Sequence, residues 1–223
     1  SPAVSTYDFS EDDYATIPDG AVRVTNEKPL DGGTWIVEQG YRLSNGEFLA
    51  HGTATIWWDK ERTEKVGEVP MFHGKQHGVA RRFHRNGVLA FEIVFVKDRK
   101  HGLACDWFED GTKSSEENWL DGVQHGSSQV WHPNGQMKVR CEYSHGTLHG
   151  PYSEWTSEGV EICHGDYRNG EPVGVWRLGY AEPFTSRWRY IEVNAGTPTV
   201  GTRSELLSKL NLWNSAMGIR VPF

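Results

Sequence analysis

The chain has few cysteines, no long apolar run and no excess of positive charge. Its three cysteines fit neither the even count of a disulfide framework nor the spacing of a metal site, and they favour a reducing compartment such as the cytoplasm. No stretch approaches the ~18 consecutive apolar residues of a membrane-spanning helix. The 30 acidic residues outnumber the 23 Lys and Arg residues and leave a net charge of −7. Nucleic acids and anionic lipids both need an exposed basic surface, so we expect neither as the main partner, although contact with a membrane surface stays open.

The short motifs that carry enzyme chemistry are also missing. The sequence has no Gly-x-Ser-x-Gly, no phosphate-binding glycine loop and no His-Glu-x-x-His. The neighbouring carboxylates of Glu116 and Glu117 would point to opposite faces of a strand, so they could not act as an acid–base pair. We therefore expect no catalytic residue, no cofactor and no metal site.

What the sequence does contain is a repeat with a period of 24 residues. A His-Gly pair begins at His77, His101, His125 and His149. An aromatic residue follows each histidine six positions later, and a glycine follows it ten positions later. An upstream pair at His51 fits a step of 26 residues, which means that two residues are inserted there. A fixed period of this length indicates an array of supersecondary units and not one irregular core.

The residues between successive His-Gly pairs predict two antiparallel strands. Apolar and polar side chains alternate along 137–143, which is the pattern of a strand with one face against a core. Before this strand, Pro133 and Gly135 suit a type I turn followed by a glycine with a positive φ. Equivalent turns are expected at 85–87, 109–111 and 157–159. Successive hairpins would then extend one meandering sheet.

The same turn predicts a register for the tryptophans. With a three-residue turn, Trp131 pairs with Met137, and both would share a face with the alternating residues Val139, Cys141 and Tyr143. Equivalent positions form a row along the array, called here the tryptophan row: Trp57, Trp107, Trp131 and Trp155. We expect these rings to pack together as the core of the array. The alternative is a platform that holds a sugar or an apolar helix.

The order of an aromatic residue, two spaced glycines, a second aromatic residue and Asn/Asp-Gly resembles the MORN repeat. It is most similar to a bacterial variant that ends in His-Gly, over about residues 40 to 179. The resemblance implies an elongated single sheet of stacked hairpins, and a role in scaffolding or binding proteins and sometimes membranes. It brings no catalytic residues, and some bacterial members are classed as antitoxins. Asp98 for glycine, Val173 for histidine and Met71 for an aromatic residue depart from the pattern in single units.

The segments before the array predict an arm and a cap. Residues 1–20 carry five acidic residues and no Lys or Arg, and we expect them to form a solvated acidic arm. Strands are expected at 21–25 and 34–43, inside an N-terminal cap that spans 21–50. The repeat array is then expected to cover 51–179.

The segment after the array, 180–223, predicts a final strand at 186–193 and a helix. Thr202 and Glu205 form a capping box that begins this helix. Four residues at helical spacing make an apolar stripe along it: Leu206, Leu210, Trp213 and Met217. Such a helix would cover the last open edge of the sheet, or would be presented to a partner. The predicted class is therefore all-β, with a short C-terminal capping helix.

Arginines and histidines are the remaining candidates for a site. Arg81, Arg82 and Arg85 belong to a basic stretch that is either a solvated face or a docking patch. Eight histidines precede a glycine, but equivalent ones in neighbouring units lie two strands apart, ~10 Å, too far to share a zinc ion. We expect turn histidines whose rings bond to backbone carbonyls.

The sequence thus predicts a non-catalytic repeat scaffold that binds another protein through a sheet face or a groove. One alternative is a carbohydrate- or lipid-binding module that uses the tryptophan row. Another is an antitoxin-like inhibitor of a partner enzyme. The candidate binding residues are Trp57, Trp107, Trp131, Trp155, Arg81, Arg82 and Arg85.

Overall fold

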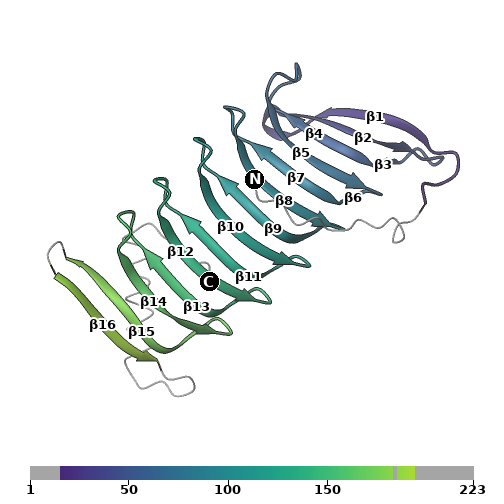
Figure 1. Ribbon diagram of the computed structural model, residues 1–223. Coiled ribbons are helices and arrows are strands. Elements are labelled where there is room, and N and C mark those ends of the chain that lie inside the picture. The colour runs from purple at the N-terminus through teal and green to yellow at the C-terminus, as the bar shows by residue number, and fades with distance from the viewer. Residues whose placement is uncertain (1–15, 183–184, 194–223) are drawn as a thin grey trace.

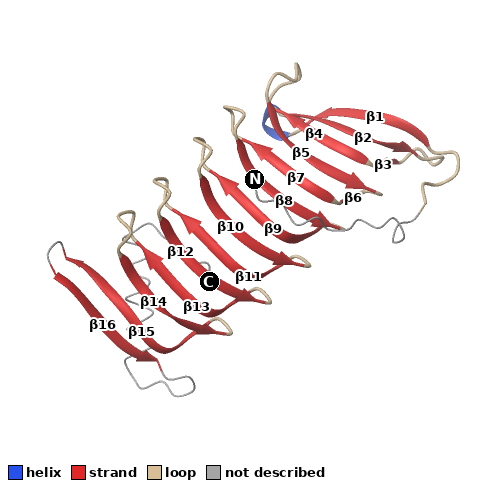
Figure 2. Cartoon of the chain, viewed as in Figure 1, coloured by secondary structure: helices blue, strands red, loops and turns tan. Residues whose placement is uncertain are grey.

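A computed structural model describes residues 16–182 and 185–193 of the chain. Within these ranges, sixteen strands form one antiparallel sheet, and the only helical element is a short 3-10 turn at Asp31–Gly33. The strands follow one another along the sheet almost in chain order, so the molecule is a long ribbon of hairpins (Figure 1). Figure 2 shows that short turns join the strands along both long edges of this ribbon. The predicted single antiparallel sheet is confirmed.

The ribbon begins with β1 (Val22–Pro29), β2 (Trp35–Arg42) and the short β3 (Phe48–Ala50), which pairs with β2. The repeats that follow comprise β4 (Gly52–Trp57), β5 (Lys65–Phe72), β6 (Lys75–Gln76), β7 (Gly78–Phe83), β8 (Leu89–Val96), β9 (Arg99–Trp107), β10 (Lys113–Leu120), β11 (Val123–Trp131), β12 (Met137–Ser144), β13 (Thr147–Trp155), β14 (Glu161–Arg168) and β15 (Glu171–Glu182). The strand expected at 186–193 is β16 (Thr185–Val193), which pairs with β15. Residues 1–15 of the expected arm and the expected helix after Thr202 lie outside the described residues.

One edge of the ribbon carries the hairpin turns that the sequence predicted. In the turn of the third regular unit, the amide of Gly135 donates to the carbonyl of His132 at 2.8 Å, and the amide of His132 donates to Gln136 at 2.8 Å. Gly135 has a φ of 83°, and the equivalent Gly87, Gly111 and Gly159 have φ values of 81°, 85° and 82°. Glycine occupies these positions because a side chain strains this backbone conformation.

The opposite edge carries tighter turns of two residues, called here the return turns. They lie at 73–74, 97–98, 121–122, 145–146 and 169–170, and both residues of each have positive φ. His145 has a φ of 50° and Gly146 a φ of 84°, and the amide of Gly146 bonds to the carbonyl of Gln124 at 2.9 Å in the preceding unit. Turns of this type match the twist of the strands that they join. The return turns are thus stacked on one another along the edge.

The predicted face of Trp131 is wrong. Trp131 pairs with Met137 as expected, but the next pair is Val130 with Val139, because a β-bulge inserts one extra residue after the turn. The bulge places Trp131 on the face opposite Val139 and Cys141. The same shift occurs beside the tryptophans of the other units. Strict alternation missed it, since one extra residue moves every later side chain to the other face.

The face opposite the tryptophan row holds the core, and we call it the core face. Its centre is a series of equivalent buried residues, one from each unit: Ala54, Ala80, Ala104, Ser128, Tyr152 and Trp176. Ala80 pairs with Ile93, which is fully buried, and further along Ser128 pairs with Cys141. Ala80, Ile93 and Ala104 form one buried cluster, and Cys141, Tyr152 and Trp176 belong to a second.

Gly165 shows how one sheet face accommodates the largest ring. Its backbone lies beneath the indole of Trp176, and a Cβ on Gly165 would lie only 2.2 Å from Cδ2 of that ring. The ring of Tyr167 meets the same indole edge-on, with centroids 5.1 Å apart. Tyr152 is paired with Gly165 across the hairpin, so a large residue again stands opposite the smallest.

We expect Gly165→Ala to destabilise the protein through this overlap with Trp176, by about 1–3 kcal/mol, as overpacked cores do. Gly135→Ala is the matched control, since no atom lies within 4 Å of its Cβ and only its positive φ is strained, at a cost of roughly 1 kcal/mol. Urea unfolding measures both. A second change, Trp176→Phe, should restore part of the loss in Gly165→Ala and none in Gly135→Ala. Equal midpoints for Gly165→Ala and the wild type would contradict this packing.

Candidate functional site

The tryptophan row lies on the face opposite the core face, called here the outer face, beside the hairpin turns. All four of its rings are half-buried. The residue paired with each ring differs in charge from unit to unit: Lys65 with Trp57, Lys113 with Trp107, Met137 with Trp131 and Glu161 with Trp155. The expectation that these rings form the core is therefore corrected: the row is a partly exposed surface of mixed aromatic and charged side chains.

Lysines lie over two rings of the row, Trp57 and Trp131. The Nζ atom of Lys65 lies 5.8 Å from the ring centroids of both Trp57 and Phe83. Lys113 lies at the same distance from the ring of Trp131, one unit along. A cation over an aromatic face is attracted by the negative charge of the ring's π system, by about 0.5–1 kcal/mol at an exposed site. The lysines thus bridge rings of neighbouring units.

Ion pairs on the outer face compensate much of its charge. Lys113 pairs with Glu116 at 2.6 Å, and Lys65 pairs with Glu68 at 3.3 Å. Arg81 contacts Glu92 at 2.6 Å and Glu68 at 3.5 Å. These pairs are partly exposed, so each adds little stability. Their effect is to fix the side chains beside the tryptophan row.

The structure does not bring the three predicted arginines together. Arg81 lies on the outer face, and Arg82, the next residue, is exposed on the core face, where it pairs with Phe91. Arg85 lies in a hairpin turn, with its guanidinium 4.2 Å from the ring centroid of Trp58. The arginines of the basic stretch, for which a docking patch was one of two alternatives, are therefore divided between two faces and a turn.

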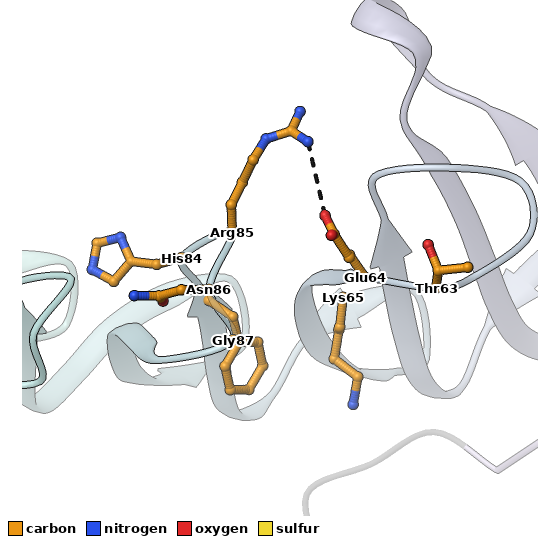
Figure 3. A pocket seen from close by; sticks show the side chains of 8 residues that line it. Thr63, Glu64, Lys65, His84, Arg85, Asn86 and Gly87 are labelled. Carbon is orange, nitrogen blue, oxygen red and sulfur yellow. Dashed lines mark ion pairs between the residues drawn. The ribbon is translucent and has the colours of Figure 1, made fainter.

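A shallow hollow lies beside Arg85, between its hairpin turn and the longer loop 58–64 (Figure 3). It measures about 390 Å³, and Phe83 and Lys65 are among its lining residues. Arg85 and Glu64 face each other across it at 3.8 Å. The inserted pair of residues that the sequence showed after His51 lengthens this loop, so the insertion was the signal for the hollow.

Neighbouring hairpin turns are joined in pairs, which gives the array a longer period. The ring of His84 donates from Nε2 to the carbonyl of Trp107 at 2.7 Å, and the amide of Asn86 donates to Glu109 at 2.8 Å. His132 and Asn134 make the same two bonds to the next turn, at 2.9 Å and 2.6 Å. His84 and His132 are 48 residues apart, twice the sequence period. Alternate units are therefore the most alike.

Two segments of the chain, residues 76–97 and 124–145, match the family model of the MORN repeat variant. These two segments are MORN-type repeats. The matched segments start 48 residues apart, so they are two of the alternate units that share His-x-Asn-Gly turns. No curated protein matches the chain. MORN repeats are non-catalytic modules that mediate interactions with proteins or membrane lipids. Across the described ranges, no helix is long and apolar enough to cross a membrane.

The histidines of the His-Gly pairs support the return turns of the MORN units. His125 accepts at Nδ1 from the backbone amide of His145, at 3.4 Å, and His149 accepts in the same way from Asn169. The expected bonds to carbonyls are thus replaced at these two positions by bonds from amides. No group of three or more His, Cys, Asp or Glu side chains that could hold a metal ion exists in the part of the chain that the structure covers.

One serine, one histidine and one glutamate lie together on the outer face without forming a catalytic relay. Ser153 Oγ lies 2.8 Å from Nδ1 of His164, and Glu161 lies 3.7 Å from the same nitrogen. A relay needs the two partners on different ring nitrogens. Burial also raises the pKa of both Cys105 and Cys141 to about 11, so their thiols stay protonated and are weak nucleophiles.

Glu154 is the buried carboxyl of the core face. Burial raises its pKa, because a charge without water is unfavourable; the hydroxyl of Tyr152, which donates to it, and the charge of Lys138 oppose the shift. The folded state keeps this carboxyl protonated up to a higher pH than the unfolded chain does. Glu154 therefore contributes most to stability at low pH.

The contribution of Glu154 to the free energy of unfolding should therefore fall as pH rises from about 4.3, the ordinary value for Glu, through the raised pKa of the folded state. Glu154→Gln should remove this part of the fall, since an amide does not titrate. Urea unfolding at a series of pH values measures it. Glu158→Gln is the control: that carboxyl is exposed and its pKa is lowered, mainly by the hydroxyl of Ser157, so its loss leaves the fall in place. Parallel curves for Glu154→Gln and wild type would refute the assignment.

Proposed function

We propose that this protein is a non-catalytic scaffold that binds another protein through its outer face, along the tryptophan row. The observation that carries the proposal is the position of the four rings. They are half-buried on an open sheet face, opposite the face that packs the core. Tryptophan is enriched, with tyrosine and arginine, at the energetic centre of protein interfaces, because one rigid ring buries a large area on contact.

The surroundings of the row support a binding role. Lys65 and Lys113 lie over the rings, and each is held in turn by a glutamate three residues on. Side chains that are already ordered lose less entropy when a partner binds. Equivalent rings stand on alternate strands, ~10 Å apart, so a partner lying along the ribbon could contact several rings at once.

A carbohydrate or lipid ligand is the second candidate. The carboxylate of Glu161 and the ammonium of Lys113 are paired in the sheet with Trp155 and Trp107, and polar groups beside an aromatic ring suit a sugar. An antitoxin-like role is the protein-binding proposal with a toxic enzyme as the partner. Identification of the partner distinguishes a scaffold for another protein, a carbohydrate- or lipid-binding module and an inhibitor of a toxic enzyme.

The test is affinity capture from a lysate with the wild type and two variants, followed by binding measurements on the purified partner. Trp131→Ala should weaken binding by roughly 30-fold or more, the loss typical of an interface centre. Arg82→Ala is the matched control, because this exposed side chain lies on the core face. A partner that binds Trp131→Ala as tightly as the wild type, or that is lost with Arg82→Ala, would contradict the proposed face. The same variants are tested for binding to glycans and to liposomes. Binding by the wild type that is lost in Trp131→Ala would favour a carbohydrate or lipid ligand over a protein partner.

The folding of the variant needs its own check. Because Trp131 is half-buried, Trp131→Ala should lose well under the ~3–5 kcal/mol that a fully buried tryptophan costs. Urea unfolding measures this loss. A loss of the full size would place the ring in the core and would explain lost binding by unfolding.

A further inference from the structure

The return-turn edge is positively charged over the first units of the array, although the chain as a whole carries −7. Four permanent cations lie at or beside the return turns 73–74 and 97–98, and four histidines lie in the same region. We call these residues the cationic edge: Lys75, Lys97, Arg99, Lys100, His51, His73, His77 and His101.

Positive charges crowd one another along the cationic edge. The pKa of His77 is lowered first by burial and then by the charge of Lys97. The pKa of His51 is lowered by burial, by His73 and by Arg23. Crowding of this kind favours a negatively charged ligand, which relieves the repulsion.

The two acids at these turns already have partners within the edge. A carboxylate oxygen of Asp98 accepts from the backbone amide of Gln76 at 2.7 Å. Asp121, in the next return turn, lies 3.6 Å from Nδ1 of His101. Among the residues that the structure describes at these turns, these two carboxylates are outnumbered by the four permanent cations.

The chain itself contains a segment of complementary charge. Residues 7–14 read Tyr-Asp-Phe-Ser-Glu-Asp-Asp-Tyr and combine four carboxylates with three aromatic rings. Residues 1–15 contain no Lys or Arg, and they lie outside the described residues. The cationic edge offers an aromatic ring of its own, since Phe72 lies 4.5 Å from His73 and 4.6 Å from His51 between ring centroids.

The chain enters the sheet at the edge where these cations lie. Val22, the first residue of β1, pairs with Arg42 at one end of β2, whereas Trp35 at the other end of β2 pairs with Trp57 beside the hairpin turns. The start of β1 is therefore on the return-turn side of the ribbon (Figure 1). β7 lies four strands away from β1, at ~19 Å. Fifteen residues can span up to ~50 Å.

We propose that the acidic segment 7–14 binds the cationic edge of the same chain. Its carboxylates pair with Lys75, Lys97, Arg99 and Lys100, and its aromatic rings lie near Phe72. Attachment to β1 keeps the segment at a high effective concentration at this edge, so weak pairs suffice to hold it. The edge is then a receptor for acidic peptide segments, and an acidic partner must displace the chain's own segment. This inference does not rest on the tryptophan row.

The test is zero-length cross-linking of the full chain with a water-soluble carbodiimide, which joins a carboxylate to an amine in contact with it. Peptide mapping should show bonds from Asp8, Glu11, Asp12 or Asp13 to Lys75, Lys97 or Lys100. High salt should abolish these bonds, because it shortens the range of the attraction to a few ångströms, about 3 Å at 1 M. An equal mixture of isotopically light and heavy chains distinguishes bonds within one chain from bonds between two.

Lys60 is the internal control. It is exposed, like Lys97, but it lies in the loop 58–64 on the hairpin-turn edge. The proposal expects few bonds to Lys60, and it expects the double variant Lys97→Gln, Arg99→Gln to lose most bonds to Lys75 and Lys100. Lys60→Gln should leave them unchanged. Equal bonding to Lys60 and to the cationic edge, bonding only between different chains, or no bonding at all would each overturn the proposal.

Discussion

Within residues 16–182 and 185–193, the single sheet has no second layer to pack against, and this constraint shapes every unit that the structure describes. The units must bury their core face against one another along the ribbon. The central series on that face accordingly begins with alanines such as Ala80, which stands opposite the larger Ile93. It ends with Tyr152 and Trp176, which have room because Gly165, against which both lie, has no side chain. Large and small residues alternate across each hairpin, because close packing allows neither voids nor overlap.

The β-bulge after each hairpin turn separates the tryptophan row from the core face. Without it, the rings of the tryptophan row would lie on the core face and would be buried in the core. The extra residue turns those rings to the outer face, where lysines and glutamates of the neighbouring strands order them. Because the bulge recurs from unit to unit, a local irregularity produces a long row of half-buried rings on one side of the ribbon.

The two edges of the ribbon differ because their turns differ. Return turns need two residues with positive φ, and Asp98 adopts a φ of 67° where the other four return turns have glycine: Gly74, Gly122, Gly146 and Gly170. Aspartate tolerates this region of backbone space better than most residues do, so a departure from the repeat leaves the fold unchanged. The same substitution does change the chemistry of the edge, since its carboxylate bonds to Gln76. On the hairpin-turn edge, two inserted residues lengthen the loop 58–64. A hollow opens between this loop and the regular turn that contains Arg85.

The sequence alone determined the repeat, its hairpins and the position of each hairpin turn, because these depend on local signals. Glycines such as Gly135 mark the positive φ, alternation marks the strands, and a constant period requires that every unit fold in the same way. The tertiary structure decided which face each side chain occupies. The bulge beside Trp131 has no signature in a two-residue period, and the three neighbouring arginines could be separated only once the register was known. Pairings between strands, such as Tyr152 with Gly165 or the ammonium of Lys113 over Trp131, depend on how units stack, and residues distant in sequence meet only there.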